Sequence, residues 1–375
     1  DGLKFGALTS KNATLEELYL LQKLTRGMGS DNLDYRSDFA NPAAANILKS
    51  SISLAELEDI DHALIVGSHL RLEQPMINHR IRKATLNGAS VSAINAQTFD
   101  SNYRINNNLL TAPQNTLATL SGVLKAVLNE ASEKQPDYLN SVVVEQAHKD
   151  IADNLLNAEN AVVILGEHVN GNPDSDGISQ LVKDIAEASQ AQTLNVSLTS
   201  NSLAAEQVGF RPVKGKNALE ILASDLNSFV MFDIYPDFDC FNPESAIENL
   251  SRSDAFVVSL NSFEDDSVLK YSDVVLPIAS FYETSGTHVN IDNISQSYSA
   301  SVKSAGDSKP GWKVIKVLAD LLEIQGFEFV DSCEVADEAL SMTPATSVAK
   351  AKITGSEIPE ISTVWQYTPY AVDAF

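Results

Sequence analysis

The sequence predicts an α/β fold with two doubly wound, Rossmann-like lobes, and three observations lead to this prediction. Short apolar runs without polar alternation recur along the chain, as in strands buried on both faces of a parallel sheet. Amphipathic helical segments separate these runs, which is the order of βαβ units. The runs are too many for one comfortable sheet, so two lobes are expected for 375 residues.

The first elements are a strand and a capped helix. Residues 3–8 form an apolar segment that is typical of a strand. Thr14 and Glu17 then make a capping-box pattern, in which each side chain can accept a hydrogen bond from the backbone N–H of the other residue. We therefore expect a helix that begins after Thr14 and ends near Gly27.

The clearest βαβ unit starts at residues 63–67, an apolar run that ends in glycine. Pro75 stands where a first helical residue is expected, Gly88 closes the helix, and residues 89–94 form the next strand. The same order recurs downstream. Further strands are predicted at 161–166, 193–198, 229–232, 255–260 and 274–276, and helices within 113–131, 143–157, 178–191, 243–250 and 312–324.

Two stretches do not follow this order. The polar, asparagine-rich residues 95–108 are predicted to be a surface excursion, and the weakly periodic residues 331–375 to be a linker or a docking tail. The chain begins at Asp1, without a methionine, and enters a strand almost at once. We therefore expect it to be a segment of a longer protein.

The charge balance excludes phosphate-rich partners. The chain carries 50 Asp and Glu against 26 Lys and Arg, a formal net charge of −24. Nucleic acids and anionic membrane surfaces attract clustered basic residues, so this chain is expected to bind neither. No apolar run reaches the ~18 residues that span a bilayer, so no direct membrane insertion is expected.

Metal-binding patterns are weak. Cys240 and Cys333 lie far apart and form no CxxC pattern, so they could not hold a four-thiolate cluster. Residues 172–177 begin like a calcium loop, but Lys183 stands where a bidentate glutamate is needed, which favours a turn before a helix. The six histidines form no close pair. We assign no metal ligand and no catalytic residue.

The loop at residues 67–75 is a candidate ligand site because it connects the carboxyl end of a strand to a helix. Gly67 and Ser68 could approach a ligand there, and Arg71 could pair with a phosphate or a carboxylate. An ordinary ion pair between Arg71 and Glu73 is an equally good interpretation.

A second candidate is the segment 279–290, which also follows a strand. It is dense in polar side chains around one glycine, the composition expected of a cradle for a polar ligand. Its candidate residues are Glu283, Gly286, Thr287, Asn290 and, slightly downstream, Gln296.

These residues resemble a known family. Residues 271–277, followed by Glu283 to Thr287, Asn290 and Gln296, are similar to a signature segment of the molybdopterin oxidoreductase superfamily. Within that superfamily the chain most resembles the large iron–sulfur subunit family of respiratory complex I, NADH:quinone oxidoreductase. Further segments that fit this pattern in the same order are 14–19, 29–36, 71–75, 237–240 and 310–316.

The resemblance implies both a fold and a set of departures. In the superfamily, two α/β lobes hold the nucleotide ends of a molybdopterin cofactor, and a residue shortly after an N-x-D turn ligates the metal. Near Asp34 only Ser37 and Asp38 offer such donors, and no cysteine does. Residues 290–296 lack the Glu-Gly-Arg of the pattern, which removes a phosphate partner and a close backbone approach. We expect a vestigial pocket without the cofactor.

The resemblance also implies domain limits and a role. One lobe is expected to be split, residues 1–57 plus 213–330, with residues 58–212 inserted as the other. Iron–sulfur clusters are implied for the full-length subunit but not for this fragment. The chain would be a structural part of the complex I peripheral arm, which carries electrons from NADH toward quinone, held by other peripheral-arm subunits on the cytoplasmic side of a bacterial-type inner membrane.

Two alternatives remain open. One is a molybdopterin-binding oxidoreductase with degenerate motifs. The other is a non-enzymatic α/β protein that binds a small ligand in its crevice.

Overall fold

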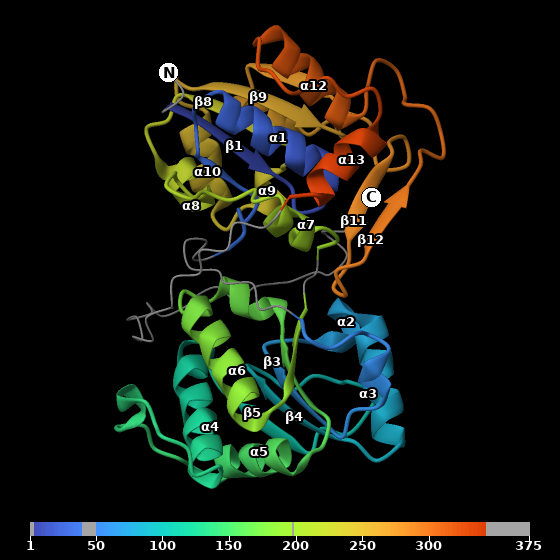
Figure 1. The fold of residues 1–375 in the computed structure, drawn as a ribbon. Helices are drawn as coiled ribbons and strands as arrows, with labels where there is room; N and C mark the ends of the chain where they lie inside the picture. The colour runs from blue at the N-terminus through green and yellow to red at the C-terminus, as the bar shows by residue number, and fades with distance from the viewer. Residues whose placement is uncertain (1–3, 40–49, 197–198, 343–375) are drawn as a thin grey trace. The chain divides into compact units, whose positions relative to one another are not determined.

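The computed structural model describes residues 4–39, 50–196 and 199–342, which form two compact units (Figure 1). Unit 1 is made of the first and third of these ranges, and unit 2 of the second. Each unit contains a five-stranded parallel sheet with helices. The α/β fold class predicted from the sequence is confirmed.

The sheet of unit 1 combines strands from both chain segments. Its order is β10-β9-β8-β1-β2, and every neighbouring pair is parallel. In Figure 1 the blue strand β1 lies beside the yellow strand β8, with Phe5 opposite Ser228. The strands are β1 (Phe5–Thr9), β2 (Leu33–Asp34), β8 (Ser228–Phe232), β9 (Phe256–Asn261) and β10 (Val274–Pro277).

Helices of unit 1 form two groups. α8, α10 and α11 share an apolar core with β1, β8 and β9, while α1 packs against α12, α13 and α7. The helices are α1 (Leu15–Gly27), α7 (Ser202–Gln207), α8 (Ala218–Ala223), α9 (Pro236–Asp239), α10 (Pro243–Leu250), α11 (Asp266–Tyr271), α12 (Gly311–Leu321) and α13 (Ser332–Leu340). An antiparallel hairpin, β11 (Gly286–Val289) and β12 (Ser295–Tyr298), also contacts α1.

Unit 2 has a sheet of order β5-β4-β3-β6-β7, again parallel throughout. Its strands are β3 (His62–Val66), β4 (Ser90–Asn95), β5 (Asn107–Leu110), β6 (Ala161–Leu165) and β7 (Gln192–Asn195). Its helices are α2 (Leu70–Glu73), α3 (Pro75–Leu86), α4 (Thr116–Glu130), α5 (Gln146–Asn157) and α6 (Ser175–Ser189), with short 3₁₀ turns η2 to η5 at 56–58, 113–115, 137–139 and 167–171. An apolar core joins α4, α5 and α6 to the sheet.

The structure draws the boundaries of the units differently from the sequence. Residues 50–57 belong to unit 2, because the Ser51 N–H donates to the Thr193 carbonyl beside β7. Residues 199–212 belong to unit 1, where the Asn201 amide donates to the carbonyls of Ala13 and Thr287. Nothing in the local composition marks these positions, since long-range contacts define them.

Two further segments differ from the prediction. The end of the asparagine-rich stretch 95–108 enters the edge strand β5, which pairs with β4. Part of the predicted tail 331–375 is the helix α13, which packs on α1, while residues 343–375 lie outside the described residues. In the described ranges, no helix combines the length and the apolar character that a membrane span requires.

Candidate functional site

The carboxyl edge of each sheet is the natural place for a ligand in this fold. Open parallel sheets bind ligands where the chain leaves neighbouring strands in opposite directions. That point lies between β1 and β8 in unit 1 and between β3 and β6 in unit 2. The two edges are described one after the other.

In unit 1 the chain passes from β1 into the capped start of α1. The Thr14 hydroxyl accepts from the Glu17 N–H at 3.3 Å, and the Glu17 carboxylate accepts from the Thr14 N–H at 2.9 Å, so the predicted capping box is present. Glu17 is buried, and a Cβ added to Gly311 would lie only 2.4 Å from its Oε1 atom. The turn before α12 therefore closes over this carboxyl group.

Three carboxyl groups at this edge hold protons more tightly than usual. Burial raises the pKa of Glu17 to about 7, and the charge of Asp233 adds to the shift. Burial likewise raises the pKa of Asp239 to about 7, with Asp233 and Asp38 contributing. The pKa of Asp233 itself is raised by burial. The edge is thus rich in carboxyl groups, and Lys11 pairs there with Asp38.

The turn after β2 is closed by a buried ion pair. Arg36 Nε lies 2.8 Å from Asp34 Oδ1 and Arg36 Nη2 lies 3.0 Å from Asp34 Oδ2, a bidentate arrangement. Asp34 also accepts from the backbone N–H groups of Tyr35, Arg36 and Ala218. The Tyr35 hydroxyl donates to Glu206 at 2.8 Å. Residues at the place of the N-x-D turn are therefore committed to the internal structure of unit 1.

Ser37 and Asp38, the two donors that sequence comparison singles out after this turn, are also engaged. The Ser37 hydroxyl donates to the Asp239 carbonyl at 2.7 Å, and one Asp38 oxygen pairs with Lys11. Within the described ranges, no group of three or more His, Cys, Asp or Glu side chains has a geometry that could hold a metal ion.

The β11–β12 hairpin contains four of the predicted site residues. Thr287 donates its N–H and its hydroxyl to the buried Glu16 carboxylate, and an added Cβ on Gly286 would lie 2.3 Å from Thr14 Cγ2. Asn290 Oδ1 accepts from the N–H groups of Asp292 and Ile294 and so shapes the turn. Gly286 and Thr287 therefore hold the hairpin against the start of α1.

The remaining two candidates of this segment, Gln296 and Glu283, have other neighbours. Gln296 is exposed on β12, opposite His288. The Glu283 carboxylate accepts from the N–H groups of Ser280 and Ala305 and ties two loop segments together. Unit 1 therefore brings Gly286 and Thr287 together but does not gather all five candidates around one cavity.

In unit 2 the candidates Gly67 and Ser68 follow β3. Gly67 has φ +64°, and an added Cβ would lie 2.8 Å from Val169 Cγ2, so this position requires glycine. The backbone is also close to the next loop, because a Cβ on Gly166 would lie 2.3 Å from the Gly67 carbonyl oxygen. Ser68 donates its N–H to Asn95 Oδ1 and its hydroxyl to Glu73 Oε2.

Arg71 and Glu73 do not pair with each other. Arg71 forms an ion pair with Asp100, while buried Glu73 accepts from Ser68, from the His69 N–H and from His168 Nε2 at 2.8 Å. Burial favours the neutral form of Glu73, but these hydrogen bonds outweigh it and lower the pKa of the carboxyl group. The alternative interpretation of this loop, an ion pair between Arg71 and Glu73, is therefore wrong.

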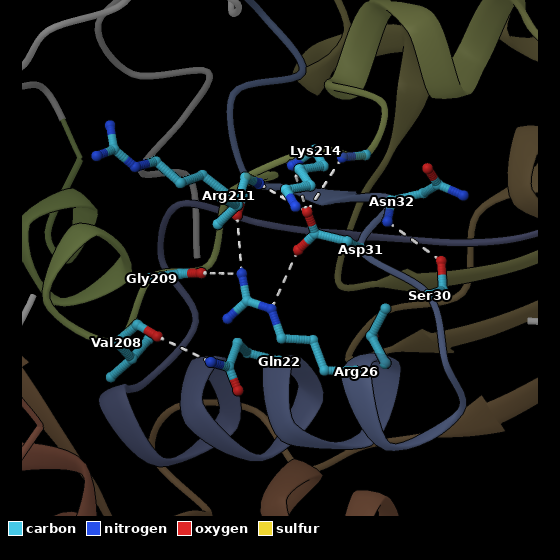
Figure 2. A network of polar contacts seen from close by, with 12 residues as sticks. Gln22, Arg26, Ser30, Asp31, Asn32, Val208, Gly209, Arg211 and Lys214 are labelled. Carbon is cyan, nitrogen blue, oxygen red and sulfur yellow. Dashed lines mark hydrogen bonds and ion pairs between the residues drawn. The ribbon is translucent and has the colours of Figure 1, made fainter. Parts of the chain in front are cut away.

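A polar network joins the two chain segments of unit 1 (Figure 2). Asp31 Oδ2 accepts from the N–H groups of Val213, Lys214 and Gly215 at 2.7, 2.7 and 3.0 Å, and Arg26 Nε lies 3.2 Å from Asp31 Oδ1. These bonds lower the pKa of Asp31 although its partial burial opposes the shift. The network fastens the returning segment to the N-terminal one.

Sequence reasoning missed the side chains that organise both edges. Glu16 and Glu73 lie in segments that fit the family pattern, but neither they nor His168 were predicted to organise an edge, and only contacts between distant residues assign that role. The capping-box pattern did identify the position of Glu17, but not the raised pKa of its carboxyl group.

Two groups of curated relatives are about equally similar to the chain. The NADH-ubiquinone oxidoreductase 75 kDa subunit of Reclinomonas americana is 24% identical over 326 residues, covering 84% of this chain and 40% of that protein. A putative formate dehydrogenase of Staphylococcus aureus is 24% identical over 421 aligned residues, covering 92% of this chain and 42% of that protein. The chain thus spans about two fifths of the length of each.

Solved structures support the fold. Acetylene hydratase from Pelobacter acetylenicus superposes with a TM-score of 0.71 at 13% identity, covering 91% of this chain and 58% of that chain. A formyltransferase/hydrolase complex from Methylorubrum extorquens gives a TM-score of 0.57 at 13% identity, covering 85% and 91%. A model of the molybdopterin oxidoreductase family matches residues 1–321. The chain therefore belongs to the molybdopterin oxidoreductase family.

Proposed function

We propose that this chain is a cofactor-free structural portion of a larger electron-transfer subunit, of the complex I large-subunit type. The single observation that carries the proposal is the acidic carboxyl edge of unit 1. A molybdopterin dinucleotide is anionic through its phosphates, and phosphate sites in proteins are built from Arg, Lys and free backbone N–H groups. This edge instead gathers the carboxyl groups of Glu17, Asp233 and Asp239.

The donors that a cofactor would need are already used. Thr287 donates both its N–H and its hydroxyl to Glu16, and the acceptor Asn290 Oδ1 is occupied by the N–H groups of its own turn. The metal-ligand position offers Ser37, whose hydroxyl donates to the Asp239 carbonyl. A cofactor would have to break several of these bonds, so the residues of unit 1 do not fit the group.

In unit 2, too, the candidate ligand-binding side chains already have partners within the protein. Its candidate phosphate partner Arg71 is paired with Asp100, and Ser68 donates to Glu73. The buried, ionised Glu73 next to this loop adds negative charge where an anionic ligand would sit. This supports a vestigial crevice in unit 2 as well.

The full-length protein would then work as part of an assembly. We propose iron–sulfur clusters in the parts of the subunit outside this chain, other peripheral-arm subunits as partners, and a position on the cytoplasmic side of a bacterial-type inner membrane. The assembly would carry electrons from NADH toward quinone. The similarity to a 75 kDa subunit supports this assignment over that part of the relative which the chain covers.

A second candidate is a molybdopterin-binding oxidoreductase. The similarity to a putative formate dehydrogenase, at the same identity and over more of the chain, favours it. In that case the edge carboxyl groups would have to be neutral or displaced when the cofactor binds.

Metal and pterin analysis of the purified chain separates the two candidates. The protein is produced in a host that makes molybdenum cofactor, and molybdenum, tungsten and the fluorescence of oxidised pterin are measured against protein concentration. We expect amounts far below one per chain. One metal atom and one pterin per chain would contradict the cofactor-free proposal and favour a molybdopterin-binding oxidoreductase.

A further inference from the structure

The segments that follow β8 and β9 in unit 1, including the short helix α9, expose three phenylalanine side chains on the surface. Phe238 is 65%, Phe241 40% and Phe263 48% exposed. Single exposed apolar residues are common, but a group of them at one edge of a sheet is a mark of an interaction site. This edge is the carboxyl edge, where the fold presents its loops.

The backbones of Phe238 and Phe263 are tied to the same residue, Tyr235, and Phe241 follows on the same chain segment as Phe238. The Phe238 N–H donates to the Tyr235 carbonyl, and the Phe263 N–H donates to the Tyr235 hydroxyl, both at 2.9 Å. The Phe241 N–H donates to the Ser37 carbonyl at 2.8 Å. The helices α9 and α11, which follow the two strands, are in contact.

Carboxylates surround the phenylalanines. Asp237 precedes Phe238, Glu264 follows Phe263, and Asp266 starts α11; all three are exposed. None of them has an ion-pair partner in the part of the chain that the structure describes. We call the surface made by these side chains the aromatic-acidic edge: Asp237, Phe238, Phe241, Phe263, Glu264 and Asp266.

The charge of the surrounding segment is strongly one-sided. Residues 217–270 contain eleven Asp and Glu residues and two bases, Arg252, which contacts Asp254, and Lys270 on α11. A neutral apolar partner would leave these carboxylates without compensation, and an acidic partner would be repelled. The complementary partner is cationic.

Arginine matches both features of the surface. Its planar guanidinium stacks on aromatic faces and donates two parallel hydrogen bonds to a carboxylate. The lysine ammonium, by contrast, is a more strongly hydrated point charge. We propose that the aromatic-acidic edge is the docking surface for an arginine-rich segment of a partner protein. The inference rests on the proposed structural role, because it says what kind of partner surface that role uses.

The test measures binding of a defined peptide to the full chain. A fluorescein-labelled peptide that alternates arginine with alanine is titrated with the protein and followed by fluorescence anisotropy. Peptides with lysine or glutamate in place of arginine are measured in parallel. We expect the arginine peptide to bind most tightly, the lysine peptide more weakly and the glutamate peptide not at all, and we expect added salt to weaken binding.

Variants assign the binding to the surface. Phe238→Ala with Phe263→Ala, and separately Glu264→Gln with Asp266→Asn, should each weaken binding by about tenfold or more. Phe256→Ala is the matched aromatic control, since Phe256 is 51% exposed at the opposite end of β9, and Asp320→Asn on α12 is the charge control. Both controls should bind as the unchanged chain does.

Several outcomes would overturn the inference. It fails if the arginine peptide does not bind, or if the controls weaken binding as much as the paired variants do. It also fails if the phenylalanine pair lowers the melting temperature strongly while the carboxylate pair folds normally and keeps full binding. The metal and pterin measurements use no peptide. A failure of the peptide to bind would therefore leave the cofactor-free proposal unaffected.

Discussion

Thr287 holds the buried Glu16 carboxylate with two hydrogen bonds, from its N–H to Oε2 at 2.9 Å and from its hydroxyl to Oε1 at 2.8 Å. The two residues belong to β11 and to the first turn of α1. Burial raises the pKa of Glu16, while the bonds from Thr287 oppose that shift. The contact attaches the hairpin to the N-terminal segment of unit 1.

Replacing Thr287 with valine should therefore destabilise unit 1. The substitution keeps the shape of the side chain but leaves Glu16 Oε1 without its donor, at a cost of about 1–3 kcal/mol in the free energy of unfolding. Urea denaturation measures the loss. Thr287→Ser retains the hydroxyl and is the matched control; equal losses in the two variants would contradict the role given to the hydrogen bond.

Gly286→Ala should destabilise the hairpin for a steric reason. The added Cβ would lie 2.3 Å from Thr14 Cγ2 and 2.8 Å from Thr14 Cβ, so the hairpin must shift, at a cost of about 1–3 kcal/mol. Thr14→Ser removes Cγ2 and keeps the capping hydroxyl. The double variant should recover part of the loss. A melting temperature of Gly286→Ala equal to that of the unchanged chain would argue against this packing.

Asp31→Ala should loosen the junction between the two segments of unit 1 shown in Figure 2. It leaves the N–H groups of Val213, Lys214 and Gly215 and the Arg26 Nε–H without their acceptor, while Arg26 Nη2 keeps its bonds to the carbonyls of Gly209 and Arg211. We expect a loss of about 2–4 kcal/mol in the free energy of unfolding. Proteolysis near residues 211–216 should also become faster.

Asp225→Ala, at an exposed carboxylate of the same unit, serves as the control for that experiment and should change stability by less than about 0.5 kcal/mol. If both variants lose the same stability, general charge removal and not the network explains the effect.

Glu17 makes stability depend on pH in a defined direction. Its folded pKa is raised from 4.5 to about 7, so the folded state binds the proton more tightly than the unfolded state does. This contribution is fully present below about pH 4.5 and is lost as the pH rises through about 7. Since each pKa unit corresponds to ~1.4 kcal/mol, the loss is of the order of 3 kcal/mol.

Glu17→Gln isolates this effect, because glutamine still completes the capping box but does not titrate. Free energies of unfolding are measured for both proteins at several values between pH 5 and pH 8. The unchanged chain should lose stability relative to the variant as the pH rises. Parallel curves would show that Glu17 is ionised throughout this range.

Local sequence signals predicted the framework well. The capping box at Thr14 and Glu17 and the apolar runs that became β3, β6 and β8 depend on neighbours a few residues apart, which the sequence displays directly. The two-residue strand β2 and the edge strand β5 were missed, because pairing with β1 and β4 and not their own composition makes them strands.

The ligand-binding roles of the candidate site residues stay predictions. Motif resemblance selected Thr287 and Asn290 as candidates for a vestigial pocket; in the structure Thr287 bonds to Glu16 and Asn290 shapes the hairpin turn. Their donor and acceptor groups are the right kind for a ligand, but chemistry alone does not say which partner they meet. The acidic edge depends on burial, which no sequence pattern displays.

The sequence by itself determined the α/β class, most of the βαβ order and the resemblance to the molybdopterin oxidoreductase family, because periodicity, caps and motif order are local properties of the chain. Only the tertiary structure decided where unit 1 resumes, which acceptors Thr287 and Arg71 engage, and that the charge of Asp233 acts on both Glu17 and Asp239. These features join residues that are far apart in sequence, so they exist only once folding has brought those residues together.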